Sequence, residues 1–78
     1  MREELAQYSH EVWAQWMKYL FSECEENDDG SVTIPAEFIS RWNRQINTSY
    51  SDLSASEKES DRAEADKIIK IIMTVCYG

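Results

Sequence analysis

The sequence predicts a small all-α domain of three helices, with a short extended segment between the first and the second. Apolar residues recur at intervals of three and four near both ends of the chain, which is the spacing of one helix face. Gly30 and Pro35 interrupt this pattern in the middle. With 78 residues, the chain is long enough for one domain, which we place over residues 1–78.

The first helix is predicted over residues 3–23. Its apolar residues occupy nearly half of the helix circumference: Leu5, Tyr8, Val12, Trp13, Trp16, Met17, Leu20 and Phe21. A face this wide indicates packing against more than one neighbour, either within a monomeric core or across the seam of a homodimer. We expect the three tryptophans of the chain to form most of the core.

An acidic turn follows the first helix. Five acids precede Gly30, namely Glu23, Glu25, Glu26, Asp28 and Asp29. The run from Asn27 to Gly30 favours a turn with positive φ at the glycine, and residues 31–34 are β-prone but too few for a sheet alone. The run imitates a calcium loop, but Ala36 stands where that loop needs a bidentate Glu, so we expect no metal.

The second helix is predicted over residues 35–46, beginning at the proline, and the third over 55–76. A polar connector, residues 47–54, joins them. Ser54 and Glu57 have the spacing of a capping box at the start of the third helix. We expect the first and third helices to pack along most of their length, with the second helix across one end.

Three charges interrupt the apolar stripe of the third helix. The column Cys76, Ile72, Ile69 and Ala65 continues towards the N-terminus as Arg62 and Lys58, and a neighbouring column ends at Asp61. The cluster is either a paired latch onto His10 or the Ser9 hydroxyl of the first helix, or a site that presents cations to an anionic ligand. In the second interpretation, Trp13 or Tyr50 is the stacking wall. We favour the latch.

A second basic patch lies on the second helix, where Arg41 and Arg44 flank the Phe38 and Trp42 stripe. It could dock an acidic partner or phosphate, or it could neutralise the surplus acids of the chain. We favour intramolecular neutralisation.

The formal net charge of −7 disfavours direct contact with nucleic-acid phosphates or with an anionic membrane. The sequence has no apolar run long enough to span a bilayer, and charges begin at Arg2, so we expect no secretory leader. Cys24 and Cys76 fall on apolar helix columns and predict buried free thiols in a reducing compartment. We therefore expect a cytoplasmic protein without a cofactor.

Both ends of the chain resemble the ryanodine-receptor repeat domain, in the compact form found in bacteria and their phages. The first match is Leu5-Ala6, His10 and Trp13, and the second is Tyr50, Leu53, Glu57, Lys58, Asp61 and Arg62, with Tyr77-Gly78 at the close. The middle, residues 30–47, departs from the family pattern. The resemblance implies a non-enzymatic recognition module that binds a host protein or a small anionic signalling nucleotide in a counter-defence role. No catalytic residues transfer.

A second class of function follows from charge. The acidic run could mimic nucleic acid and block a basic groove of a host nuclease complex, as an anti-CRISPR or anti-restriction protein does. An enzyme is the least favoured class, because a chain of 78 residues has little room for a cleft. If the chain is phage-encoded, either role places it in the cytoplasm of the host cell.

Overall fold

A computed structural model describes residues 1–77. The elements are α1 (Arg2–Glu23), β1 (Glu25–Glu26), β2 (Val32–Thr33), α2 (Ala36–Ile46), the 3-10 turn η1 (Tyr50–Asp52) and α3 (Ala55–Tyr77). The predicted all-α class with a short extended segment is therefore confirmed, and each helix boundary lies within one residue of the prediction. Gly78, part of the family resemblance, lies outside the described residues.

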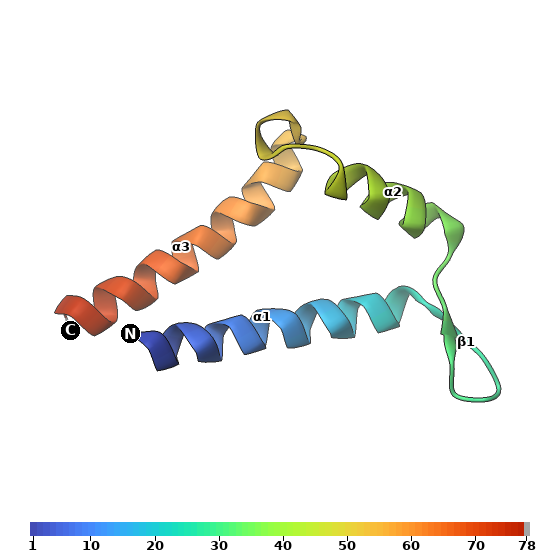
Figure 1. The fold of residues 1–78 in the computed structure, drawn as a ribbon, viewed down its shortest axis with the longest axis horizontal. Helices are drawn as coiled ribbons and strands as arrows, with labels where there is room; N and C mark the ends of the chain where they lie inside the picture. The colour runs from blue at the N-terminus through green and yellow to red at the C-terminus, as the bar shows by residue number, and fades with distance from the viewer. Residues whose placement is uncertain (78) are drawn as a thin grey trace.

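The three helices form an open triangle (Figure 1). The N-terminal end of α1 lies beside the C-terminal end of α3, the two helices diverge from there, and α2 spans the gap between their far ends. The molecule measures 50 × 33 × 16 Å. A helix with its side chains is about 10–12 Å across, so the triangle is a single layer of helices. Most domains have at least two layers.

The prediction that α1 and α3 pack along most of their length is wrong. The column of α3 that faces α1 is apolar only in its C-terminal half, where it carries Ile68, Ile71 and Val75. Towards the N-terminus the same column carries Glu64 and then Asp61. Carboxylates cannot replace aliphatic side chains against an apolar helix, so the contact is confined to one end of the triangle.

The single layer leaves the chain without a buried core. None of residues 1–77 is buried, and the predicted tryptophan core is wrong, because Trp13 and Trp16 expose 58% and 54% of their surfaces and Trp42 is half-buried. The predicted burial of the thiols is also wrong: Cys24 is half-buried and Cys76 is exposed. In a single layer, each helix contacts its neighbours only within the plane of the layer. Its surface above and below that plane stays exposed.

The segment between α1 and α2 is a small antiparallel hairpin that pairs Glu25 with Thr33 and Glu26 with Val32. Gly30 has a φ of 87°, which confirms the predicted positive-φ turn. The turn is held by the Asn27 amide N–H, which donates to the Ser31 carbonyl at 2.9 Å. The Ser31 amide N–H in turn donates to the Asp29 carboxylate at 3.0 Å. The hairpin projects from one corner of the triangle (Figure 1).

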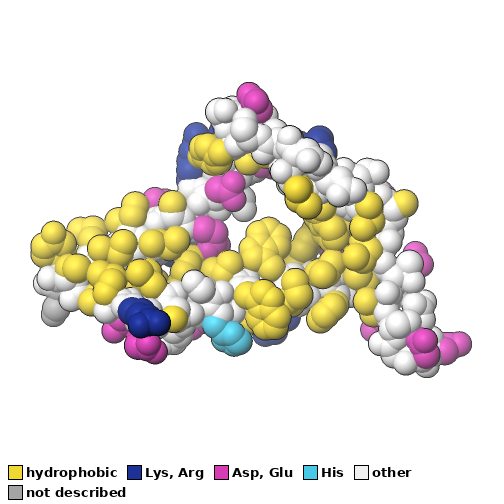
Figure 2. All heavy atoms as spheres, viewed as in Figure 1, with side chains coloured by type: hydrophobic (Ala, Val, Ile, Leu, Met, Phe, Trp, Pro, Cys, Tyr) yellow, Lys and Arg dark blue, Asp and Glu magenta, His cyan; other side chains and the backbone are white. Residues whose placement is uncertain are grey.

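One flat side of the triangle is apolar. Figure 2 shows hydrophobic atoms over α1, over α2 and over the C-terminal half of α3. Helical spacing places six exposed side chains together on that side of α1 and α3. We call them the apolar face: Trp13, Trp16, Ala65, Ile69, Ile72 and Cys76. Glu4, Gln7, Glu11, Lys67 and Lys70 lie about half a turn away on the two helices, so the opposite side is polar.

Candidate functional site

Helix α3 carries two apolar columns, and only the first of them lies on the side of α3 that contacts another helix of the described chain. The first column, with Ile68, Ile71 and Val75, lies on the side of α3 that contacts α1, and Ile68 and Val75 still expose 38% and 40% of their surfaces there. The second column, Ala65, Ile69, Ile72 and Cys76, lies about a quarter turn away on the apolar face, and all four residues are exposed. Ile69 exposes 53% of its surface. A helix with two apolar columns requires two packing neighbours, and α3 has one in residues 1–77.

A polar contact closes the junction of α1 and α3. The Tyr8 hydroxyl donates a hydrogen bond to the Glu64 carboxylate, which stands at the end of the apolar part of the α1-facing column. This hydrogen bond, together with partial burial, raises the pKa of Tyr8 to about 12. On the polar side of this junction lies an open groove of about 450 Å³, lined by charged and amide side chains of α1 and α3 together with Tyr8, Ile71 and Val75.

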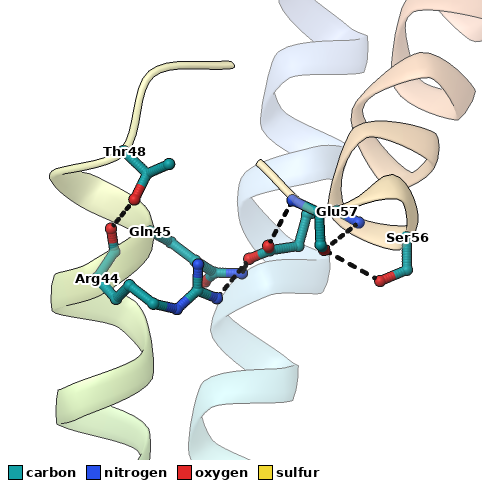
Figure 3. Close-up of polar contacts among 6 residues, drawn as sticks. Arg44, Gln45, Thr48, Ser56 and Glu57 are labelled. Atoms are coloured by element: carbon teal, nitrogen blue, oxygen red, sulfur yellow. Dashed lines mark hydrogen bonds and ion pairs between the residues drawn. The ribbon is translucent and has the colours of Figure 1, made fainter. Parts of the chain in front are cut away.

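A second polar network joins α2 to α3 around Glu57 (Figure 3). Arg44 on α2 donates from Nη2 to Glu57 Oε2 at 2.8 Å, and the Gln45 amide donates to the same oxygen. The other oxygen, Oε1, accepts from the Ser54 amide N–H at 3.1 Å, and the Glu57 amide N–H donates to Ser54 Oγ at 3.2 Å. The predicted capping box is therefore confirmed.

The Glu57 carboxylate is well enclosed, with 15% of its side chain exposed. The hydrogen bonds from Arg44, Ser54 and Gln45 favour its ionised form, and they lower its pKa to about 2. Glu57 therefore caps its own helix and also ties the polar connector and α2 to α3. The capping role was evident from sequence spacing, whereas the contact with Arg44 had no local signal.

The three charges predicted to act together lie in two different surroundings. Lys58 is half-buried, and its ammonium lies 5.9 Å from the centre of the Tyr50 ring. Arg62 is exposed and pairs with Glu59, Nη1 to Oε2, at 3.3 Å. The hydrogen bond that Arg62 donates to Glu59, followed by the influence of Tyr50, raises the pKa of the Arg62 guanidinium. These two cations therefore share Tyr50 as a neighbour.

Asp61 faces a different space. It lines an opening of about 380 Å³ inside the triangle, together with Trp16, Leu53 and Glu57. His10 lies beside Trp13 on α1, with ring centres 5.9 Å apart and ring planes inclined by 33°. The structure thus brings Lys58, Arg62 and Tyr50 together, pairs His10 with Trp13, and places Asp61 beside Trp16.

The two arginines of α2 also differ. Arg44 is committed to Glu57, as described above. Arg41 donates from Nη2 to the Tyr19 hydroxyl at 3.0 Å, and its guanidinium lies 5.0 Å from the centre of the Phe38 ring. Both arginines line an open groove between α1, α2 and the start of α3. Arg44 is neutralised within the chain, and Arg41 contacts aromatic side chains.

The acidic residues lie on and beside the hairpin. Glu25, Glu26, Asp28 and Asp29 are exposed there, and Glu23 is half-buried at the end of α1. Hydrogen bonds from Ser31 lower the pKa of Asp29. Within residues 1–77, no group of three or more His, Cys, Asp or Glu side chains is arranged to hold a metal ion.

Comparison with known proteins gives no assignment. No protein-family model matches the chain, and neither a curated protein nor a solved structure matches it. The resemblance to ryanodine-receptor repeat domains therefore stays a prediction from sequence. In the described part of the chain, no helix combines the length and the apolar character needed to cross a membrane.

Proposed function

We propose that the chain is a non-enzymatic recognition module that binds another protein chain through its apolar face. The observation that carries this proposal is the exposure of apolar side chains from three helices on one side of a single-layer molecule. A contiguous apolar surface of this extent is typical of a protein-binding site. Glu57 and Arg44 are engaged in capping α3 and in joining it to α2, which supports a structural role over a catalytic one for this pair.

The composition of the apolar face fits a protein partner. Trp13 and Trp16 are exposed on it, and tryptophan is among the residues that contribute most to protein interfaces. The aliphatic column of α3 supplies a second strip on the same side. Because burying apolar area is favourable by about 25 cal/mol per Å², a partner that covers both strips gains its main driving force there.

A small anionic nucleotide is a weaker candidate for the ligand. The cations Lys58 and Arg62 lie beside Tyr50, but Arg62 is already paired with Glu59. The opening inside the triangle is lined by two carboxylates, Glu57 and Asp61, which repel a phosphate.

The family resemblance supplies the setting of this proposal, in which the partner is a component of bacterial defence and the chain comes from a phage or another mobile element.

The test is a pull-down from bacterial lysate with the tagged chain, using variants in matched pairs. Trp13→Lys and Ile69→Lys place a charge on the apolar face. Gln7→Lys and Thr74→Lys place the same charge on the polar side of the same two helices. We expect the polar-side variants to capture the same partner as the wild type and the apolar-face variants to lose it. Equal capture by all four variants would contradict the proposal.

The hairpin supports a second candidate function. Its four exposed carboxylates project from the corner of the triangle, where a basic groove of a nuclease complex could contact them as it contacts phosphates. The same pull-down separates the two candidates. Reversal of Glu25, Glu26, Asp28 and Asp29 to lysine removes capture if mimicry is the function and leaves it intact if the apolar face is the binding site.

A further inference from the structure

We propose that the chain on the apolar face is a second copy of this protein, with the two α3 helices packed antiparallel along their exposed columns. This inference rests on the proposed function, because it names the partner of the same face. Four features support it: the area that needs to be covered, the shape of the molecule, the heptad spacing of the exposed column, and the position of the charges on α3.

The uncovered area matches what an obligate dimer buries. The chain exposes 6381 Å², whereas a folded monomer of 9.1 kDa exposes about 4,900 Å². The excess is therefore about 1,500 Å² for each chain, or about 3,000 Å² for a pair of chains. Obligate homodimers bury about 2,000–5,000 Å² in total. One second copy is thus sufficient to remove the excess.

The shape gives the same answer. The radius of gyration is 16.2 Å, against about 11.5 Å for a compact chain of this length. Two such layers packed about 10 Å apart have a combined radius of gyration of about 17 Å, against about 15 Å for a compact molecule of twice the length. Stacking two layers therefore converts an expanded chain into a particle of nearly normal compactness.

The exposed column of α3 is a heptad seam. Its residues Ala65, Ile69, Ile72 and Cys76 are spaced by four, three and four, which is the spacing of knobs in a coiled coil. In an antiparallel pair, Ile69 of one copy meets Ile72 of the other, and Ala65 meets Cys76. Every layer of this seam is then apolar on both sides.

The charges that precede this column select the antiparallel direction. Arg62 and Lys58 continue the column towards the start of α3. In a parallel pair each would face its own copy, and like charges would repel. In the antiparallel pair, Arg62 and Lys58 of the two copies lie beyond the last apolar layer at opposite ends of the seam, so these like charges do not face each other. The cations that interrupt the apolar stripe therefore stand at the ends of the seam.

The first measurement is the molar mass of the purified wild-type chain by light scattering at micromolar concentration. We expect twice 9.1 kDa. The second measurement is disulfide cross-linking in a Cys24→Ser background. We expect Ala65→Cys to cross-link to Cys76 of the second copy about tenfold faster than the matched control Ala63→Cys, which lies on the polar side of α3, because the seam raises the effective concentration of the two thiols.

The remaining outcomes are decisive. Loss of the cross-link in Ala65→Cys/Cys76→Ser supports the antiparallel seam, whereas its persistence, or a fast Cys76–Cys76 cross-link in the parent, overturns it. If the chain is monomeric and acrylamide readily quenches its tryptophan fluorescence, the proposal of a second copy is overturned. The proposed function still stands, because the apolar face is then exposed and available to another partner. A monomer whose tryptophans are protected overturns both. The mass measurement uses the wild type, so it does not depend on the folding of any variant.

Discussion

At the scale of single residues, Glu57 makes one contact that local sequence spacing predicts and another, with a different helix, that the spacing does not predict. The spacing of Ser54 and Glu57 is enough to predict a helix cap. The same carboxylate also accepts hydrogen bonds from Arg44 and Gln45, which lie about a dozen residues earlier on α2. No local sequence pattern indicates this contact. Lys58, Asp61 and Arg62 show the converse, because they share a region of the helix in sequence but lie in different surroundings in space.

The depressed pKa of Glu57 makes the junction of α2 and α3 sensitive to acid. Because its pKa in the folded chain is about 2, below the ordinary 4.5, the folded state binds fewer protons there than the unfolded state. The stability that the carboxylate supplies is complete above pH 4.5 and is lost as the pH falls towards 2. We therefore expect Glu57→Gln to lower stability at pH 7 and to flatten the loss of stability on acidification.

Urea unfolding followed by circular dichroism between pH 7 and pH 2 measures this effect. The control is Glu37→Gln, at an exposed glutamate in the first turn of α2, which should follow the wild-type pH profile. If the Glu57→Gln profile also runs parallel to that of the wild type, the Arg44–Glu57 contact does not contribute to stability.

At the scale of elements, much of the structure was predictable from sequence. Periodicity, Pro35 and the capping box located each helix boundary within one residue. The packing of the helices was not predictable, because α3 carries two adjacent apolar columns and the sequence does not say which of them faces α1. The candidate site was missed for the same reason: the apolar residues assigned to a core are the ones that lie exposed on the apolar face.

The hairpin between α1 and α2 depends on the backbone of Gly30. Its φ of 87° lies in the left-handed region, and a Cβ added there meets no atom within 4 Å, so a side chain costs conformational energy and causes no clash. We expect Gly30→Ala to destabilise the hairpin by about 1–2 kcal/mol and Gly30→Asn by less, because asparagine tolerates this conformation. Amide hydrogen exchange at Val32 and Thr33 measures the difference, and equal effects of the two substitutions would contradict this explanation.

At the scale of the whole molecule, charge opposes self-association. Each chain carries −7, so two stacked chains bring like charges together around the rim of the interface. Salt screens this repulsion, since the Debye length falls from about 30 Å at 0.01 M to about 8 Å at 0.15 M. We expect the dimer dissociation constant, measured by sedimentation equilibrium, to fall severalfold over this range. Weaker association at higher salt would mean that ion pairs, and not the apolar face, dominate the contact.

The thickness of 16 Å has a consequence for the lifetime of the chain in a cell. Proteases cleave locally unfolded segments, and in a molecule one helix thick no second layer opposes the local unfolding of an unpartnered copy. If the partner is the second copy proposed above, its binding to the folded chain lowers the population of these unfolded segments by mass action. Proteolysis would therefore degrade the chain at low concentration, where it is monomeric, and spare it at high concentration, where it is dimeric.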